Sequence, residues 1–474
     1  MSKYYILEDR YVLRGWQHAG RMLIRRPDNK HRVLKELEFQ TLLLCDGKTD
    51  FESSFITDDI RGLAERIEKR GIIRICETGE ELTQDQKYRF YDNRFVEEVM
   101  WSVTGLCNYR CRHCFMDAPD GSLGQISHEM ATRIVDEIAA CGVLKVSLTG
   151  GEPLIRPDLW EIIDRLKEHK VDISVLYTNG ALLSDQTLEA FLSRGLKPQI
   201  STSFDGVGWH DWMRGIEGAE GETVAAIRRA VKYGFIVNAS VCVHKGNLSV
   251  LRETADLLTE LGVKKISFGQ VSDTVLWRKK AEGMELSKKE YLDGLMPMID
   301  WFYEKGMPLD LALGNLVFLK HGSRVYSIAA EPFSKVQDCS MCYLCDDARF
   351  AAYIAPDGQL LPCMPLTSVP AEQLKTFPKL SDISLKKALS SSDYLEFISR
   401  RIFQLFLVNE ECRNCEFRMR CGGGCRAQAM IQGGDLMGAD PGRCYLWKNG
   451  YPDLIRVRIN MAASHLFIDV KNGN

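Results

Sequence analysis

The alternation of strand-like and helical segments between residues 96 and 320 restricts the fold more than any other feature. Short runs rich in Val, Ile, Ser and Thr predict strands at 98–104, 145–150, 172–179, 198–204, 236–243 and 265–270, and amphipathic segments between them predict helices such as 130–142, 158–169, 184–195 and 248–262. Strands that alternate with helices on this scale form parallel sheets through right-handed crossovers. We therefore predict an α/β fold, a partial (β/α)6 TIM-like barrel, with its site at the carboxyl ends of the strands.

The sequence on either side of this barrel has a different character, so we expect three domains, at 1–95, 96–325 and 326–474. Residues 1–95 combine short strands with two helical segments, one ending at Gly47 and one capped by Thr57 or Asp58. This order predicts a winged-helix-like α+β module. The last region is rich in cysteine and glycine, which favours a domain organised around metal.

Composition limits the partners and the compartment. The 474 residues carry a net charge of −3, with acidic and basic residues interspersed, so nucleic acid is not an expected partner. No apolar run approaches the roughly 20 residues that cross a bilayer, so no membrane is expected. Charges throughout residues 3–14 break any signal-peptide-like segment, and we expect a cytoplasmic protein.

Twelve of the sixteen cysteines fall in three groups, and the first group follows the first barrel strand directly. Cys107, Cys111 and Cys114 have the spacing C-x3-C-x2-C, which allows one loop to hold an iron-sulfur cluster through three thiolates. Four irons and three ligands leave one iron open. A structural zinc site is the alternative, but it needs four protein ligands, and His113 lies too close in sequence to Cys114 to share one tetrahedral centre easily.

This loop resembles that of the radical S-adenosylmethionine (SAM) enzymes. The resemblance implies a 4Fe-4S cluster whose open iron chelates SAM, and reductive cleavage of SAM to a 5'-deoxyadenosyl radical that abstracts hydrogen from a substrate. It also implies an electron donor such as flavodoxin or ferredoxin.

The SAM contacts that the resemblance implies lie at the ends of further strands. The segment "SLTGGEP" is similar to the family's GGEP motif and would place Gly150, Gly151 and Glu152 at the methionyl amine. The segments "STSFDG" and "HDWMRG" would place Ser203 and Arg214 at the methionyl carboxylate, although a strand-end serine and a surface arginine are equal alternatives. His113 occupies the position before the third cysteine, often aromatic in the family, and would lie near the adenine.

The remaining cysteines resemble the SPASM extension of radical SAM enzymes, which holds two auxiliary 4Fe-4S clusters. They follow the pattern C-x12-G-x4-C, then C-x2-C-x5-C-x3-C, then a last cysteine. The resemblance assigns the first auxiliary cluster to Cys345, Cys363 and Cys425, with Cys339, Cys342 or an open iron completing it, and the second to Cys412, Cys415, Cys421 and Cys444. A pair of zinc sites is the alternative for this stretch taken alone.

The front module resembles the PqqD-like recognition element of enzymes that modify ribosomally made peptides (RiPP maturases). There a leader peptide adds a strand to a small sheet. A DNA-binding winged helix is the alternative, but acidic and basic residues nearly balance in this module. We therefore expect a peptide maturase that forms a crosslink on a leader-bound precursor, with a thioether ranked above a carbon-carbon bond or an epimerised residue.

Two other functions compete with this one. An anaerobic sulfatase-maturing enzyme would form formylglycine, but that group usually has an aspartate after the cysteine of the G-x4-C segment, where this chain has Met364. A non-catalytic iron-sulfur electron carrier or peptide-binding scaffold is the other alternative. The sequence identifies no catalytic acid, base or relay residue; Tyr109, Asp117 and Glu331 lie in suggestive places, but a structural role is favoured for each.

Overall fold

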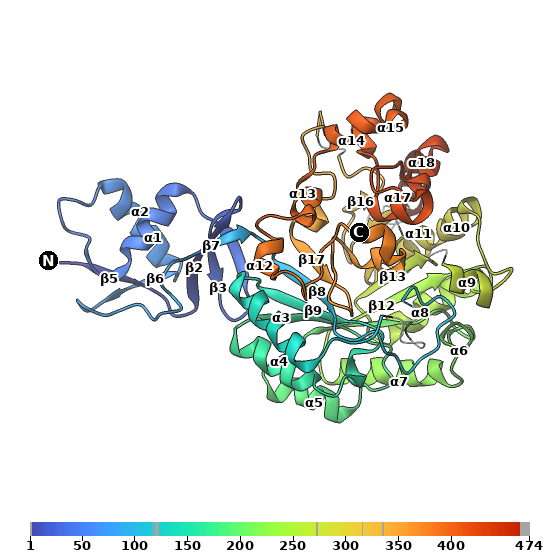
Figure 1. The fold of residues 1–474 in the computed structure, drawn as a ribbon, viewed down its shortest axis with the longest axis horizontal. Coiled ribbons are helices and arrows are strands. Elements are labelled where there is room, and N and C mark those ends of the chain that lie inside the picture. The colour runs from blue at the N-terminus through green and yellow to red at the C-terminus, as the bar shows by residue number, and fades with distance from the viewer. Residues whose placement is uncertain are drawn as a thin grey trace, which may run out of the picture.

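The computed structural model describes residues 2–116, 118, 123–271, 274–314, 316–333 and 336–464. It consists of a front module, a large open sheet flanked by helices, and a cysteine-rich C-terminal region that lies against the sheet (Figure 1). Among the residues described, no helix is both long enough and apolar enough to cross a bilayer.

The central sheet confirms the predicted partial barrel. Its strand order is β16-β15-β14-β13-β12-β11-β10-β9-β8-β17-β18, and neighbouring strands from β8 to β14 run parallel. The parallel strands are β8 (Glu98–Ser102), β9 (Lys145–Thr149), β10 (Asp172–Tyr177), β11 (Gln199–Ser203), β12 (Val237–Val243), β13 (Lys265–Gln270) and β14 (Asp310–Leu313). The six predicted strands are all present, and β14 adds a seventh.

Helices connect these strands and bury an apolar stripe against the sheet. They are α3 (His128–Ala140), α4 (Leu159–Glu168), α5 (Asp185–Ser193), α6 (His210–Arg214), α7 (Ala219–Lys232), α8 (Leu251–Glu260), α9 (Val275–Lys280), α10 (Lys288–Leu295) and α11 (Pro297–Glu304), with short 3-10 turns at Pro153–Ile155 and Leu248–Val250. In α3 the stripe consists of Ala131, Ile134, Val135 and Ile138, a spacing of three and four residues. Serine side chains cap the helices α3 and α5 at Ser127 and Ser184.

The C-terminal region continues the barrel sheet instead of forming a separate one. Strand β17 (Ala351–Ile354) pairs in parallel with β8, and β18 (Leu360–Leu361) pairs with β17. At the other edge, the antiparallel strands β15 (Val317–Leu319) and β16 (Tyr326–Ile328) follow β14. The proposed boundary at residue 326 is thus crossed by a shared sheet and a shared apolar core that includes Tyr353, Leu360 and Ile455.

The rest of this region consists of short helices. They are the 3-10 turns Asp347–Arg349, Met364–Ser368 (η5) and Ala371–Leu374, and the α-helices α12 (Leu385–Ala388), α13 (Asp393–Ser399), α14 (Ile402–Val408), α15 (Glu410–Asn414), α16 (Arg418–Cys421), α17 (Arg426–Gly433), α18 (Pro441–Lys448) and α19 (Tyr451–Ser464). Cys412 and Cys444 lie within α15 and α18, and the other cysteines of this region lie at helix ends or between helices, which brings thiols distant in sequence close together.

The front module has two sheets where the sequence analysis anticipated one. The first, β5-β1-β6, combines β1 (Tyr4–Leu7), β5 (Asp46–Asp50) and β6 (Ile73–Cys76) with helices α1 (Glu36–Leu44) and α2 (Asp58–Lys69), and Thr57 caps α2 as predicted. The second, β4-β3-β2-β7, combines β2 (Tyr11–Gln17), β3 (Gly20–Arg25), β4 (Lys30–Val33) and β7 (Arg89–Arg94).

The second sheet attaches the module to the barrel. Trp16 is buried against Tyr91 and Phe95, and its indole N–H donates to the Cys141 carbonyl at 3.0 Å. The Asn29 side chain donates to the Leu144 carbonyl at 2.7 Å. Apolar packing and specific hydrogen bonds therefore hold the module in place.

We predict that Trp16→Ala weakens this attachment. A buried tryptophan replaced by alanine costs about 3–5 kcal/mol, so the variant should unfold at lower urea concentration and be cleaved faster by protease between the module and the barrel. Phe55→Ala is the control, because Phe55 is 92% exposed and should change neither measurement. Equal sensitivity of both variants would contradict the proposed attachment.

Candidate iron-sulfur and SAM site

The first cysteine loop lies at the carboxyl end of β8, where the barrel prediction places the site. The Tyr109 backbone N–H donates to the Cys107 Sγ at 3.4 Å, and the Ala118 N–H donates to the Cys114 Sγ at 3.4 Å. An Arg214 Nη donates to the Cys111 Sγ at 3.5 Å. The thiols thus already receive hydrogen bonds suited to a thiolate, as cluster ligands require.

Backbone contacts on two sides fix the course of this loop. On one side, the Gly151 N–H donates to the Thr104 carbonyl at 2.8 Å and the Glu152 N–H to the Leu106 carbonyl at 2.9 Å. On the other side, the Arg110 and Arg112 N–H groups donate to the carbonyls of Arg214 and Met213 in α6. The loop is therefore held between the end of β9 and helix α6.

The two glycines of the GGEP segment serve this backbone contact. A Cβ added at Gly150 would overlap the Thr104 carbonyl oxygen, and a Cβ at Gly151 would overlap that of Leu106. Gly150 also has a φ of +149°, which residues with a side chain rarely adopt. The structure thus shows a close approach of both glycines to the cysteine loop, and their contact with the methionyl amine stays a prediction.

Glu152 is fully buried beneath the loop. Its carboxylate accepts hydrogen bonds from the Asn179 N–H at 2.8 Å, the Leu154 N–H at 3.1 Å and the Thr178 hydroxyl at 2.9 Å. Burial raises the pKa of Glu152 to about 7, while these hydrogen bonds lower it. A cationic group beside the carboxylate would hold it ionised, as its proposed contact with an ammonium group requires.

Arg214 is buried rather than on the surface. A second Nη lies 2.7 Å from an Asp205 carboxylate oxygen, and both side chains are less than a tenth exposed. The charge of Arg214 and the hydrogen bond with His210 hold the pKa of Asp205 well below its usual range, against the effect of burial. Ser203, at the end of β11, is partly exposed and has no side-chain hydrogen bond within the described residues.

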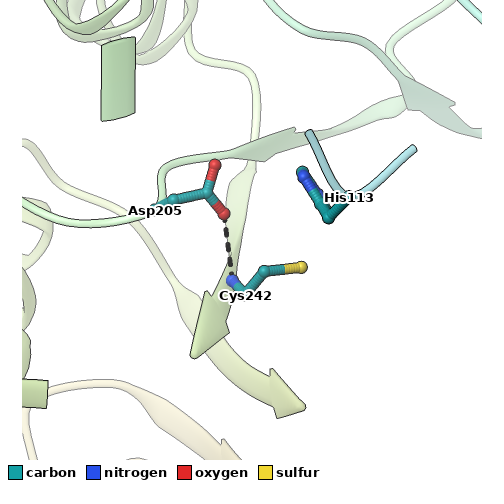
Figure 2. Close-up of side chains that lie close together, drawn as sticks. All are labelled: His113, Asp205 and Cys242. Carbon is teal, nitrogen blue, oxygen red and sulfur yellow. Dashed lines mark hydrogen bonds between the residues drawn. The ribbon is translucent and has the colours of Figure 1, made fainter. Parts of the chain in front are cut away.

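His113 lies opposite Asp205 and Cys242, pointing from the cysteine loop toward the ends of β11 and β12 (Figure 2). One ligand atom from each of the three residues lies within 4.8 Å of the others, a geometry that could hold a metal ion. Arg214 already supplies a positive charge to Asp205, and the other Asp205 oxygen accepts from the Cys242 N–H at 3.0 Å. A second cation is therefore disfavoured there, and burial lowers the pKa of His113 to about 4, which keeps its ring neutral.

Asp205, Asn179 and Thr178 are contacts that the sequence analysis missed. Asp205 stands inside the segment "STSFDG", so an acidic residue directly after a predicted buried strand was the available signal. Thr178 and Asn179 directly follow β10 and end the strand that the sequence predicts at 172–179. Of the three residues considered structural, Tyr109 is buried and donates to Glu222 at 2.9 Å, Glu331 forms ion pairs with Arg420 and Arg456, and Asp117 lies outside the described residues.

Four of the C-terminal cysteines line one cavity of about 470 Å³: Cys412, Cys415, Cys421 and Cys444. Trp447 lines the same cavity, is 5% exposed, and its indole nitrogen has no hydrogen-bond partner within the described chain. A buried donor without a partner, on a residue that lines the same cavity as four thiols, fits a sulfur-rich cluster, because cluster sulfurs accept hydrogen bonds. These are the four residues assigned from sequence to the second auxiliary cluster.

Cys345, Cys363 and Cys425 lie near one another in a second group. Burial, followed by the charges of Cys425 and Cys345, raises the pKa of the Cys363 thiol above its usual range. Three thiolates brought together repel each other, so a positively charged core would stabilise them. The buried Tyr394 hydroxyl has no hydrogen-bond partner in the described chain. Burial, followed by the charges of Cys345 and Cys363, raises the pKa of Tyr394 above its usual range.

Cys339 and Cys342 lie in one turn, in which the Cys342 N–H donates to the Cys339 carbonyl at 2.8 Å. Cys339 is fully buried beside Leu344, Ile402 and Cys412, and its thiol donates to the Arg418 carbonyl at 3.7 Å. Both remain candidates for the fourth ligand of the first auxiliary cluster.

A partial α/β barrel with three thiols at its rim and two further thiol groups beside it defines a class of iron-sulfur enzymes. Comparison with known proteins identifies that class. Residues 101–258 match the radical SAM superfamily, and residues 345–416 match the SPASM iron-sulfur cluster-binding domain. The chain therefore carries both domains of the radical SAM/SPASM class, and these domains imply 4Fe-4S clusters and SAM.

Relatives of known function match most of the chain. The PqqA peptide cyclase of Gluconobacter oxydans is 27% identical over 72% of this chain and 89% of its own length. The AdoMet-dependent heme synthase of Methanosarcina barkeri is 28% identical over 72% of this chain and 95% of its own length. The subtilosin biosynthesis protein AlbA of Bacillus subtilis is 27% identical over 51% of this chain and 54% of its own length.

Among solved structures, Streptococcus suis SuiB bound to its precursor peptide SuiA matches 93% of this chain and 99% of its own, with a TM-score of 0.63 and 16% identity. The shared fold therefore extends beyond the two matched domains.

We predict that replacing Cys107, Cys111 and Cys114 together with alanine lowers the bound iron by about one third, because one of three four-iron clusters loses its ligands. Iron and acid-labile sulfide analysis of anaerobically purified protein measures this loss. Cys141→Ala is the control, because this buried thiol of the apolar core belongs to none of the three cysteine groups and its loss should leave the iron unchanged. Zinc in place of iron would refute the assignment.

A second prediction concerns the Asp205–Arg214 pair. Asp205→Asn leaves the buried guanidinium without its counter-charge, which costs about 3–5 kcal/mol and should lower the urea midpoint measured by tryptophan fluorescence. The matched control, Asp164→Asn, removes a partly exposed ion pair with Arg194, and such pairs contribute about 0–1 kcal/mol. A comparable loss in both variants would mean that burial of the pair is unimportant.

Proposed function

We propose that this protein is a radical SAM peptide maturase that abstracts hydrogen from a residue of a ribosomally made precursor peptide and forms a crosslink, with a thioether as the first candidate. One observation supports this proposal above all. Two cavities, one beside the cysteine loop and a larger one between the barrel and the SPASM region, share a lining residue on one helix, and the larger cavity is big enough for a peptide segment.

Helix α17 provides the lining. A cavity of about 400 Å³ beside Cys114 and Phe115 is bounded by Met430 and Ile431 of this helix. A second cavity of about 970 Å³, at the carboxyl ends of β12, β13 and β14, also contacts Ile431. A substrate that enters the larger cavity can therefore approach the cysteine loop along one face of α17.

The chain's own residues would position the cofactors. When bound and reduced, the cluster and SAM supply a 5'-deoxyadenosyl radical that takes a hydrogen atom from the substrate. Cys107, Cys111 and Cys114 would hold the cluster, Glu152 would accept the methionyl ammonium, and Arg214, aligned by Asp205, would contribute positive charge for the carboxylate. The neutral His113 ring would offer a flat surface for adenine, and Ser203 a hydroxyl at the rim.

The auxiliary cysteines suit a crosslinking reaction. Joining a thiol to a carbon removes two hydrogen atoms, one to the deoxyadenosyl radical and the other as a proton with an electron. An auxiliary cluster can accept that electron or bind the substrate thiolate. The PqqA peptide cyclase and AlbA, whose names describe peptide products, support a peptide substrate.

The front module would bind the leader of the precursor. In the order β5-β1-β6, strand β6 lies at the edge, and Ile75 on this strand is 52% exposed. A leader could add a strand there through backbone hydrogen bonds. We further propose a cytoplasmic location and reduction by a flavodoxin or ferredoxin.

Two observations bear on other functions. By its name, the heme synthase among the relatives acts on a tetrapyrrole. A tetrapyrrole substrate would leave the front module of this chain without a role. A formylglycine-forming reaction has less support, since Met364 stands at the start of η5, where that group usually has an aspartate.

The proposal predicts that anaerobic, reduced protein converts SAM to 5'-deoxyadenosine and that co-expression with a cysteine-containing precursor encoded beside the gene lowers the peptide mass by two hydrogen atoms. Liquid chromatography and tandem mass spectrometry measure both. The triple alanine variant of the first cysteine loop is the control and should show neither. Intact SAM after prolonged reduction would favour the carrier or scaffold alternative, and deoxyadenosine with an unmodified peptide would point to another substrate.

A further inference from the structure

The cavity of about 970 Å³ has a polar lining contributed by two regions of the chain. Barrel residues at the ends of β12 and β13 form one side, and helix α17 with Pro441 forms the other. A smaller cavity shares Gln270, Lys288, Tyr291, Gln428 and Gln432 with it and extends to Arg443 and Leu446 of α18. The two cavities thus share one wall, and together they border the region from the barrel rim to the helix that carries Cys444.

Lys288 is a cation in this space without an acidic partner among the described residues. It is the first residue of α10, it is partly buried, and no carboxylate of the described residues lies within ion-pair distance of its Nζ. Burial lowers the pKa of Lys288, while the charges of Asp440 and Cys444 act in the opposite direction. A partly desolvated ammonium group gains stability from an anion in the cavity.

Asp440 does not satisfy this lysine. It is 3% exposed, and its two carboxylate oxygens accept from the Arg443 N–H at 3.0 Å and the Cys425 N–H at 2.9 Å. Glu285 also lines the cavity but lies on its exposed side. The amino end of α10, whose dipole favours negative charge, lies at Lys288. Lys288 is therefore available to a ligand.

Three glutamines surround the same space: Gln270 at the end of β13, and Gln428 and Gln432 on α17. The Gln432 amide donates to the Gln428 carbonyl oxygen at 2.7 Å, which leaves the remaining donors and acceptors of the pair for other partners. A primary amide offers both a donor and an acceptor, as a peptide backbone does. The lining therefore matches a peptide chain that carries a carboxylate.

We propose that this cavity binds the core segment of the peptide substrate and that Lys288 selects an acidic residue of that segment by forming an ion pair with its side chain. This inference rests on the proposed function, since it names a feature of the substrate at the same site. In this proposal the glutamines bind the peptide backbone, and Lys288 sets the preference for an acidic residue in the peptide sequence.

The test uses the full iron-loaded protein and two capped pentapeptides, N-acetyl-Ser-Gly-Glu-Gly-Ser-amide and its glutamine counterpart. Lysines are acetylated briefly with and without each peptide at millimolar concentration, and the rate at Lys288 is read by mass spectrometry. The glutamate peptide should slow acetylation of Lys288 several-fold, and the glutamine peptide should not. Lys289 is the internal control, because it is exposed, pairs with Asp293, and should react at the same rate throughout.

A charge reversal provides the second measurement. In Lys288→Glu, equilibrium dialysis of radiolabelled peptides should show loss of the preference for glutamate and several-fold tighter binding of a lysine-centred peptide. Lys289→Glu should keep the original preference. Equal protection by the two peptides, no protection by either, or an unchanged preference in Lys288→Glu would overturn the proposal. Deoxyadenosine formation and precursor modification test the proposed function separately, because the pentapeptides need not react.

Discussion

The backbone contact between the cysteine loop and the two glycines after β9 is the constraint on which the rest of the site depends. Three thiolates can share one cluster only if the loop that carries them has a fixed course, and this loop has no regular secondary structure of its own. The hydrogen bonds from Gly151 and Glu152 to the Thr104 and Leu106 carbonyls fix its entry, and those from Arg110 and Arg112 to α6 fix its middle. A side chain on either glycine would separate these backbones.

The same arrangement links the course of the cysteine loop to the residues proposed to contact SAM. Helix α6 ends at Arg214, so the element that fixes the loop also directs a guanidinium at Cys111, and Asp205 holds that guanidinium from the end of β11. On the opposite side, the backbone that contacts the loop leads directly into Glu152. Groups of opposite charge thus flank the loop, as a zwitterionic amino acid moiety requires.

Much of this arrangement could be predicted from the sequence because it depends on local patterns. Alternating strands and helices, the C-x3-C-x2-C spacing and Gly150–Gly151 are all contained in short segments, so the barrel and the position of the loop follow from them. The pairing of β17 with β8 could not be predicted, since it joins residues about 250 positions apart without any local pattern. For the same reason, the second sheet of the front module, which needs β7 beside β2, was missed.

The buried charges were also beyond the sequence analysis. Arg214 alone is compatible with a solvent-exposed position, and only the fold shows that Asp205 compensates its charge in the interior. The close approach of Gly150 and Gly151 to the cysteine loop could not be predicted either, because spacing alone does not show which backbone lies opposite.

Helix α17 connects the auxiliary cysteines to the space proposed for the substrate. It begins directly after Cys425; Met430 lines the cavity beside Cys114, Gln428 and Gln432 line the larger cavity, and Ile431 lines both. Metal binding is coupled to folding in regions with little apolar core of their own. A cluster that fixes Cys425 would therefore also fix the wall along which a peptide approaches the barrel, so the auxiliary cysteines would shape the substrate site in addition to any role in electron transfer.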